Sequence, residues 1–236
     1  MIRKFVDRER ELEILEKEWR NTPSFVVIYG RRRVGKTRLL VEFSRGGKRA
    51  FFHTFMEGGT KESQIKSLTE ELADFFDDEV FLSFSDWYPP LFKYLSGKID
   101  NKTLLVFDEF TYAVKSDKGI LSALQRVWDH ELSSKPVMLV LSGSLMGMME
   151  DEVLSHSSPP LYGRRTAGFR LRPLGLFPSL GFFEDFEEGL KFYMLLGGGV
   201  PAYLIIASRY RTVGGDFVEG GEFLTPEGGT STMSHT

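Results

Sequence analysis

The sequence predicts an α/β protein in which helices flank a parallel β-sheet. Residues 26–40 read as a buried strand, a glycine-bounded loop and the start of a helix. Residues 103–109 form an apolar run that ends abruptly in two carboxylates. Such runs are typical of central parallel strands, because helices cover both faces of these strands. With 236 residues, of which 42% are hydrophobic, the chain can bury one substantial core of this class and carry a small lid.

The composition excludes several other classes of protein. No stretch approaches the roughly 20 apolar residues that a membrane span needs, so we expect a cytoplasmic protein with no membrane contact. The chain has no cysteine, which excludes disulfides, thiolate catalysis and the common structural zinc sites. The net charge is −3, but residues 1–50 carry a net charge of +7 and residues 51–110 one of −7. A phosphate site explains the positive segment without a nucleic acid.

The elements follow from hydrophobic periodicity and from turn residues. Leu12, Leu15 and Trp19 recur at helical spacing among charged residues, which predicts an amphipathic helix. His53 lies within an aromatic strand, and we interpret it as a structural residue. We expect helices over about 8–20, 36–44, 60–76, 86–96 and 119–132, and strands over 25–29, 50–55, 103–107, 136–141 and the end of 161–171.

The loop from Gly30 to Thr37 matches the pattern G-x-x-x-x-G-K-T between a predicted strand and a predicted helix, which is the context of a P-loop. Its glycines allow backbone N–H groups to turn inward around a triphosphate, and the helix adds its positive N-terminal end. Lys36 would reach the β- and γ-phosphates, and Thr37 would ligate Mg²⁺. The predicted nucleotide-binding residues of this segment are Gly30, Arg31, Arg32, Arg33, Val34, Gly35, Lys36, Thr37 and Arg38. Its three arginines are expected to point outward, towards solvent, a lid or a partner.

Asp108 and Glu109 follow the apolar strand, at the edge where the ligands of parallel sheets gather. There Asp108 can hold Mg²⁺, usually through water, and Glu109 can orient and deprotonate the water that attacks the γ-phosphate. A strand followed by an acidic turn is common. The position of this pair, 72 residues after Lys36 and beyond a strand and helices, nevertheless predicts a Walker B motif.

Two further segments carry candidate catalytic groups. Ser144 follows another buried strand, where its hydroxyl can contact the γ-phosphate or the attacking water; a simple turn of small residues is the alternative. Arg164 and Arg165 lie in a polar loop before the last strand. One of them can stabilise the transition state as an arginine finger, from within the chain or from a neighbour. A solvated basic loop is the alternative.

Six motifs in this order resemble the archaeal ATPase family, which belongs to the STAND branch of the AAA+-like ATPases and is related to origin-recognition ATPases. The resemblance covers roughly residues 2–210. It implies a three-layer P-loop fold with a five-stranded parallel sheet in the order 5-1-4-3-2, followed by the start of a small helical lid. The motifs lie at residues 5–12, 30–37, 107–110, 141–144, 161–165 and 198–204.

The resemblance also implies roles and boundaries. It places Arg8 near the adenine, makes Ser144 the first sensor and assigns the arginine sensor to Arg164 or Arg165. Pro201 matches the Gly-x-Pro signature that places the lid against the nucleotide. The alternative is that this proline only begins a helix after a glycine turn, a position that favours proline. We expect an ATPase core over 1–175, a partial lid over 176–211 and a poorly ordered tail over 212–236.

The resemblance ends early in the chain's C-terminal part. Family members generally continue through the lid into a winged helix and a further C-terminal domain, whereas this chain stops soon after Pro201. DNA association belongs to that part of the family, so DNA binding is only weakly expected here. One permissible back-translation of residues 229–236, read two bases later, encodes a Tyr-Asp-Glu-Pro sequence that resembles the family. We therefore expect a frameshifted, truncated member.

The sequence thus predicts an ATP-binding, Mg²⁺-dependent ATPase that uses hydrolysis as a conformational switch, through a water that Glu109 positions. Turnover is expected to be slow in isolation, because such switches need a complete lid and a neighbour. The expected partners are ATP and either another protein or a second copy of the chain. Two alternatives stay open: an interaction module that binds ATP or ADP with little hydrolysis, and a small-molecule P-loop kinase, which the acidic pair disfavours.

Overall fold

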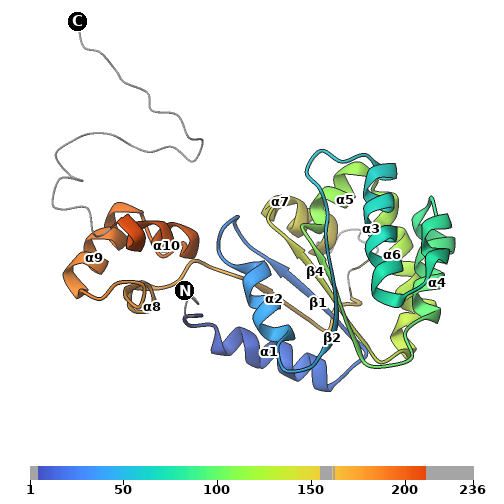
Figure 1. Ribbon diagram of the computed structural model, residues 1–236, viewed down its shortest axis with the longest axis horizontal. Helices are drawn as coiled ribbons and strands as arrows, with labels where there is room; N and C mark the ends of the chain where they lie inside the picture. The colour runs from blue at the N-terminus through green and yellow to red at the C-terminus, as the bar shows by residue number, and fades with distance from the viewer. Residues whose placement is uncertain (1–4, 155–160, 162, 211–236) are drawn as a thin grey trace, which may run out of the picture.

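The computed structural model of the protein describes residues 5–154, 161 and 163–210. Within them, a five-stranded sheet lies between two layers of helices (Figure 1). All strands are parallel, and their order, β2-β3-β4-β1-β5, is the predicted order 5-1-4-3-2 read from the opposite edge. The α/β class and the strand order are therefore confirmed. The strands are β1 (Ser24–Tyr29), β2 (Arg49–Thr54), β3 (Thr103–Asp108), β4 (Val137–Gly143) and β5 (Ala167–Arg170).

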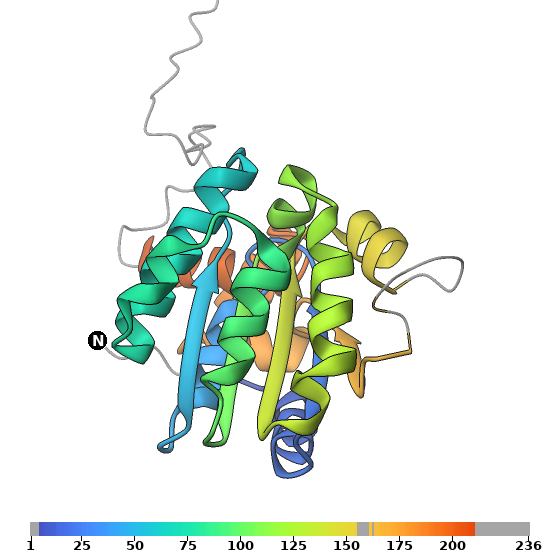
Figure 2. The same cartoon turned by 90° about the vertical axis from the view of Figure 1, so that its right-hand side faces the viewer.

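Different helices cover the two faces of the sheet. On one face, Leu15 of α1 (Glu9–Arg20) and Leu39 of α2 (Lys36–Ser44) pack with the strand residue Val106. Four helices pack on the other face, and Figure 2 shows helices of this layer in front of the strands. They are α3 (Lys61–Phe76), α4 (Phe92–Gly97), α5 (Phe110–Ser116) and α6 (Gly119–His130).

Alternate residues of β1 enter the two cores. Phe25 and Val27 join the core beneath α3 to α6, whereas Val26 and Ile28 join the core beneath α1 and α2. All four side chains are buried, so the strand is apolar throughout, as expected where helices cover both faces. This packing fixes the end of β1, from which the predicted P-loop begins.

The structure differs from the prediction in the shorter elements. The expected helix over 86–96 is a π-helical turn, η2 (Trp87–Leu91), followed by α4, because Pro90 lies within the turn and has no backbone N–H to donate. The sequence also does not predict α5, which begins directly after Glu109. The remaining short elements of the core are η1 (Glu79–Ser83), η3 (Leu132–Ser134), α7 (Met146–Met148) and η4 (Met149–Leu154).

Within the described residues, three helices follow β5, and they lie together at one end of the molecule (Figure 1). An antiparallel bridge ties their connections together: the N–H group of Leu174 donates to the carbonyl oxygen of Gly199 at 2.8 Å. A Cβ atom at Gly199 would lie 2.2 Å from the Leu174 carbonyl oxygen, so this approach requires glycine. The helices are α8 (Leu176–Leu180), α9 (Phe186–Leu195) and α10 (Pro201–Tyr210).

The predicted division of the chain at residue 175 stays a prediction, and the predicted tail over 212–236 lies outside the described residues. Among the helices that the structure describes, none combines the length and the apolar character that crossing a membrane requires.

Candidate functional site

Three segments that follow neighbouring strands meet at the carboxyl edge of the sheet. The P-loop follows β1, Asp108 ends β3, and Ser144 follows β4, which pairs with both of these strands. The register aligns Tyr29 with Gly143 and Phe107 with Leu141, so the strands end at nearly the same level. The edge therefore brings together residues that are far apart in the sequence.

Two glycines give the P-loop its shape. A Cβ atom at Gly30 would lie 2.3 Å from the backbone carbonyl oxygen of Leu171, which follows β5, so a side chain would force the loop away from the sheet. Gly35 has a φ of +97°, a left-handed conformation that residues with side chains rarely adopt. Both glycines of the G-x-x-x-x-G-K-T pattern are therefore required by the backbone.

Lys36 lies buried at the start of α2, with its ammonium group turned back into the P-loop. Its Nζ donates to the carbonyl oxygens of Gly30, at 3.0 Å, and Arg31, at 3.4 Å. Glu109 Oε1 lies 4.0 Å from the same nitrogen. Burial lowers the pKa of Lys36 from its ordinary value, because desolvation disfavours the charged form. An anion bound in the loop would relieve this cost.

Thr37 and Asp108 are joined directly, since the Thr37 hydroxyl donates to Asp108 Oδ2. The other oxygen of Asp108 accepts the N–H group of Glu109 at 3.0 Å, which fixes the plane of the carboxylate. Mg²⁺ is usually held by one or two protein oxygens together with substrate phosphates and water. The Thr37 hydroxyl and the Asp108 carboxylate fit that donor set.

Glu109 is held by Ser144. The carboxylate oxygen Oε2 accepts hydrogen bonds from the Ser144 hydroxyl, at 2.6 Å, and from the Ser144 backbone N–H, at 3.1 Å. The backbone of Glu109 is left-handed, with a φ of 49°, where the chain turns from β3 into α5. Ser144 is therefore positioned to orient the carboxylate predicted to activate water.

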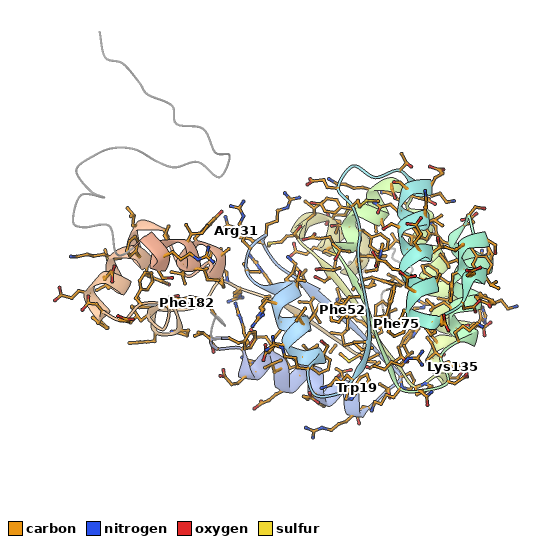
Figure 3. All side chains as sticks on the ribbon, viewed as in Figure 1. Trp19, Arg31, Phe52, Phe75, Lys135 and Phe182 are labelled. Carbon is orange, nitrogen blue, oxygen red and sulfur yellow. The ribbon has the colours of Figure 1, made fainter. Side chains whose placement is uncertain are left out.

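A cavity of ≈ 770 Å³ extends from the P-loop to α10 and to the connection between α8 and α9. This volume is within the usual size range of cofactor sites. Phe5, Phe182 and Ile205 contribute apolar walls; Phe182 lies in the connection between α8 and α9 (Figure 3). Arg31, by contrast, is exposed and is not part of the lining. The predicted residues that line the cavity are Arg8, Arg32, Arg33, Val34, Gly35, Lys36, Thr37, Arg38, Glu109 and Pro201.

Arg8 has a structural task at the cavity wall. Its guanidinium donates to the carbonyl oxygens of Arg172, at 2.7 Å, and Val34, at 3.4 Å, and it pairs with Glu11 at 3.2 Å. These bonds connect the segment before α1 to the P-loop and to the chain leaving β5. Its predicted place near the adenine is compatible with the lining position and stays a prediction.

Arg164 and Arg165 are not among the residues that line the cavity. Arg164 instead forms a two-pronged ion pair with Asp129 of α6, with both N–O distances at 2.7 Å. This pair raises the pKa of Arg164 and lowers that of Asp129. Arg164 would have to leave this partner to act on the nucleotide of its own chain, and the sensor role of Arg164 or Arg165 stays a prediction.

Sequence reasoning missed the partners of the P-loop arginines. Arg32 contacts Glu57 and Tyr112, and Arg33 contacts Tyr203 of α10, with its Nη1 3.2 Å from the hydroxyl and its guanidinium carbon 5.4 Å from the ring centre. The spacing between Glu109 and Tyr112, one turn of helix, is the signal that could have placed Tyr112 at the site.

A family of ATPase domains found predominantly in Archaea matches residues 5–205 of the chain. The chain belongs to this family. An uncharacterised protein of Methanocaldococcus jannaschii is 34% identical to this archaeal ATPase domain over 203 residues, which are 85% of the chain and 43% of that relative. The archaeal ATPase domain described here therefore spans less than half of that relative's length.

Solved structures of other ATPases share the fold. A Walker-type ATPase of Pyrococcus abyssi is 23% identical, with a TM-score of 0.66 over 89% of this chain and 69% of that one. The ORC2 protein of Aeropyrum pernix, in ADPNP–ADP complexes, is 15% identical, with a TM-score of 0.60 over 87% and 62% of the two chains. A STAND protein of Pyrococcus horikoshii with a tetratricopeptide repeat sensor is 18% identical, with a TM-score of 0.53 over 91% and 33%. The archaeal ATPase domain is thus related in fold to origin-recognition and STAND ATPases.

Proposed function

We propose that this archaeal ATPase domain binds ATP with Mg²⁺ and hydrolyses its γ-phosphate. The observation that supports the proposal is the grouping of the predicted phosphate, Mg²⁺ and water-activating residues at one edge of the sheet. Thr37 is hydrogen-bonded to Asp108, and Lys36 lies 4.0 Å from Glu109. The ORC2 protein with the same fold was solved with ADPNP and ADP, which further supports a nucleotide in this cavity.

Binding would use the P-loop backbone and Lys36. The ammonium group donates to carbonyl oxygens, which are weaker acceptors than phosphate oxygens, so the β- and γ-phosphates would draw it away from Gly30 and Arg31. Thr37 and Asp108 would hold Mg²⁺, which when bound neutralises phosphate charge.

Hydrolysis would use Glu109 as the base. Ser144 holds Oε2 of the carboxylate, and Oε1 faces Lys36. Once the phosphates attract Lys36, Oε1 is free to accept a hydrogen bond from a water. The water oxygen attacks the γ-phosphorus as the bond to ADP breaks, and the proton of the water passes to Glu109.

The same reaction would act as a switch through α8 to α10, which are the described part of the lid predicted over residues 176–211. Pro201 and Ile205 line the cavity that Lys36 also lines, and Arg33 contacts Tyr203. Loss of the γ-phosphate would therefore change the contacts between the P-loop and α10. Arg164 or Arg165 would act on a neighbouring copy, which makes self-association part of the proposal.

The main alternative is an interaction module that binds ATP or ADP without useful hydrolysis. The contact between Ser144 and Glu109 favours this alternative, because the two hydrogen bonds keep Oε2 of the carboxylate from water. A P-loop kinase for a small molecule remains the other alternative, in which an acceptor hydroxyl replaces the water.

The first test is phosphate release from ATP by the purified protein, with Mg²⁺ and with EDTA, beside calorimetric binding of ATP and ADP. Release that requires Mg²⁺ supports the ATPase. Binding without release favours the interaction module, and phosphorylation of an added small acceptor without free phosphate favours the kinase. Absence of nucleotide binding contradicts all three. Stimulation by duplex DNA would add the nucleic-acid role that is only weakly expected.

Replacing Ser144 by Ala is expected to lower turnover about tenfold while ATP binding changes little, because the variant loses one hydrogen bond to a charged group worth roughly 1.5–3 kcal/mol. The backbone N–H of residue 144 would still hold Glu109. Steady-state phosphate release and calorimetric affinity measure the two effects. Ser142→Ala is the matched control, since the Ser142 hydroxyl is buried on β4 and has no hydrogen-bond partner among the described residues. Equal turnover losses in both variants would contradict the positioning role.

Replacing Tyr203 by Ala is expected to reduce the difference in amide hydrogen exchange of α10 between the ATP- and ADP-bound states. The variant removes both the hydroxyl and the ring that contact Arg33, and such exposed cation–π contacts contribute about 0.5–1 kcal/mol. Phe177→Ala is the control, because this side chain of α8 is 79% exposed. An unchanged ATP–ADP difference in Tyr203→Ala would remove this contact from the switch.

A further inference from the structure

Arg32 is held by two residues from outside the P-loop. Its Nη2 donates to the Glu57 carboxylate at 2.6 Å and to the Tyr112 hydroxyl, and its guanidinium carbon lies 5.8 Å from the centre of the Tyr112 ring. Glu57 belongs to the loop between β2 and α3, and Tyr112 to α5, one turn after Glu109. Arg32 therefore joins the P-loop to segments that follow β2 and β3.

These contacts lie at the phosphate end of the cavity. Arg32 and Tyr112 line the same cavity as Lys36, Thr37 and Glu109. Burial is the main cause of the lowered pKa of Lys36, and the positive charge of Arg32 contributes to it as well. The two cations are thus close enough to repel each other, and an anion bound between them would relieve that repulsion.

A phosphate can replace Glu57 as the partner of Arg32 at little cost. The side chains of Arg32 and Glu57 are 56% and 65% exposed, and ion pairs in water contribute little to stability. The hydrogen bond from Arg32 lowers the pKa of Glu57, so the carboxylate is charged at neutral pH. A guanidinium offers a planar fork that binds phosphate through two parallel bonds, so a phosphate within reach is a strong competitor for Arg32.

The loop that carries Glu57 is itself anchored. The buried side-chain amide of Gln64 accepts the N–H of Met56 at 3.0 Å and donates to the carbonyl oxygen of Met56 at 2.7 Å. The N–H of Phe55 donates to the carbonyl oxygen of Asp108 at 3.0 Å, which ties the start of the loop to the end of β3. The backbone that leads into Glu57 is therefore held in place, and the exposed Arg32 side chain can turn away from it.

We propose that Arg32 binds the γ-phosphate of ATP, and that Glu57 and Tyr112 bind the Arg32 guanidinium when this phosphate is absent. In this arrangement Glu57 competes with the γ-phosphate for the guanidinium. ADP lacks that phosphate, so with ADP bound Arg32 stays on Glu57. Arg32 thereby makes the site prefer ATP to ADP. The inference rests on the proposed function, because it assumes that the cavity binds these nucleotides.

The test is a double-mutant cycle of Arg32→Ala and Glu57→Ala, with calorimetric affinities for Mg²⁺–AMPPNP, which is not turned over, and for Mg²⁺–ADP. Arg32→Ala is expected to weaken AMPPNP binding about tenfold and ADP binding by no more than about twofold. Glu57→Ala is expected to strengthen AMPPNP binding about threefold, because the competitor is gone, and to leave ADP unchanged. This gain should vanish in the Arg32→Ala background.

Two controls separate the exchange from general changes in charge. Arg45→Ala removes a cation at the far end of α2, and Glu70→Ala removes an exposed carboxylate on α3; neither residue contacts Arg32, and both variants should bind as the wild type does. Equal losses of AMPPNP and ADP binding in Arg32→Ala would make Arg32 a structural tether and overturn the proposal. A gain in Glu57→Ala that persists without Arg32 would also overturn it. Failure of the wild type to bind either AMPPNP or ADP would instead overturn the proposed function.

Discussion

Replacing Lys36 by Ala is expected to weaken Mg²⁺–ATP binding by roughly a hundredfold or more. The ammonium group would contribute about two hydrogen bonds to charged phosphate oxygens, at roughly 1.5–3 kcal/mol each, and a tenfold change in affinity corresponds to about 1.4 kcal/mol. Alanine retains good helix propensity at the first residue of α2, so the loss should come from the missing charge. Calorimetric titration with ATP measures it directly.

The same variant should leave the stability of the nucleotide-free protein largely unchanged. Burial lowers the pKa of Lys36 because desolvation makes the charged side chain costly to bury, and alanine removes that cost. Thermal unfolding without nucleotide tests this point, and Lys66→Ala on the exposed side of α3 is the control for losing one cation. ATP affinity within about threefold of the wild type would contradict the phosphate-binding role of Lys36.

The phosphate site could be predicted because its residues follow contiguous patterns. Gly30 to Thr37 form one uninterrupted segment, and Asp108 and Glu109 directly follow an apolar strand. Since the carboxyl ends of parallel strands meet at one edge, two local patterns predict one site. The strand order needed the family resemblance as well, because hydrophobic periodicity does not say that β4, rather than β2, lies beside β1.

The contacts of the arginines could not be predicted from local patterns. Arg33 contacts Tyr203, which lies 170 residues further along the chain. Arg32 contacts Glu57 in the β2–α3 loop, which Gln64 anchors through the backbone of Met56. Each contact depends on how separate elements approach one another. Sequence patterns describe which face of an element is apolar, but they do not specify which loop a surface arginine will reach.

Replacing Glu109 by Gln is expected to leave ATP affinity within about threefold of the wild type and to lower phosphate release by roughly a hundredfold or more, the usual contribution of a general base. Glutamine has nearly the shape of glutamate, and its amide oxygen can still accept the two bonds from Ser144. The amide cannot take a proton from the attacking water. Single-turnover phosphate release and calorimetric binding on the same preparation measure the two quantities.

The comparison between Glu109→Gln and Lys36→Ala distinguishes hydrolysis from binding alone. Glu109 lies 4.0 Å from Lys36, so the Gln variant also removes a negative charge beside the ammonium group, and this change favours the binding of an anion. ATP affinity should therefore hold or rise in Glu109→Gln while turnover falls. Glu70→Gln on α3 makes the same chemical change away from the site and should alter neither quantity. Equal loss of ATP binding in Lys36→Ala and Glu109→Gln would refute the separate roles of the two residues. If the wild type releases phosphate no faster than Glu109→Gln, the protein is a nucleotide-binding module without useful hydrolysis.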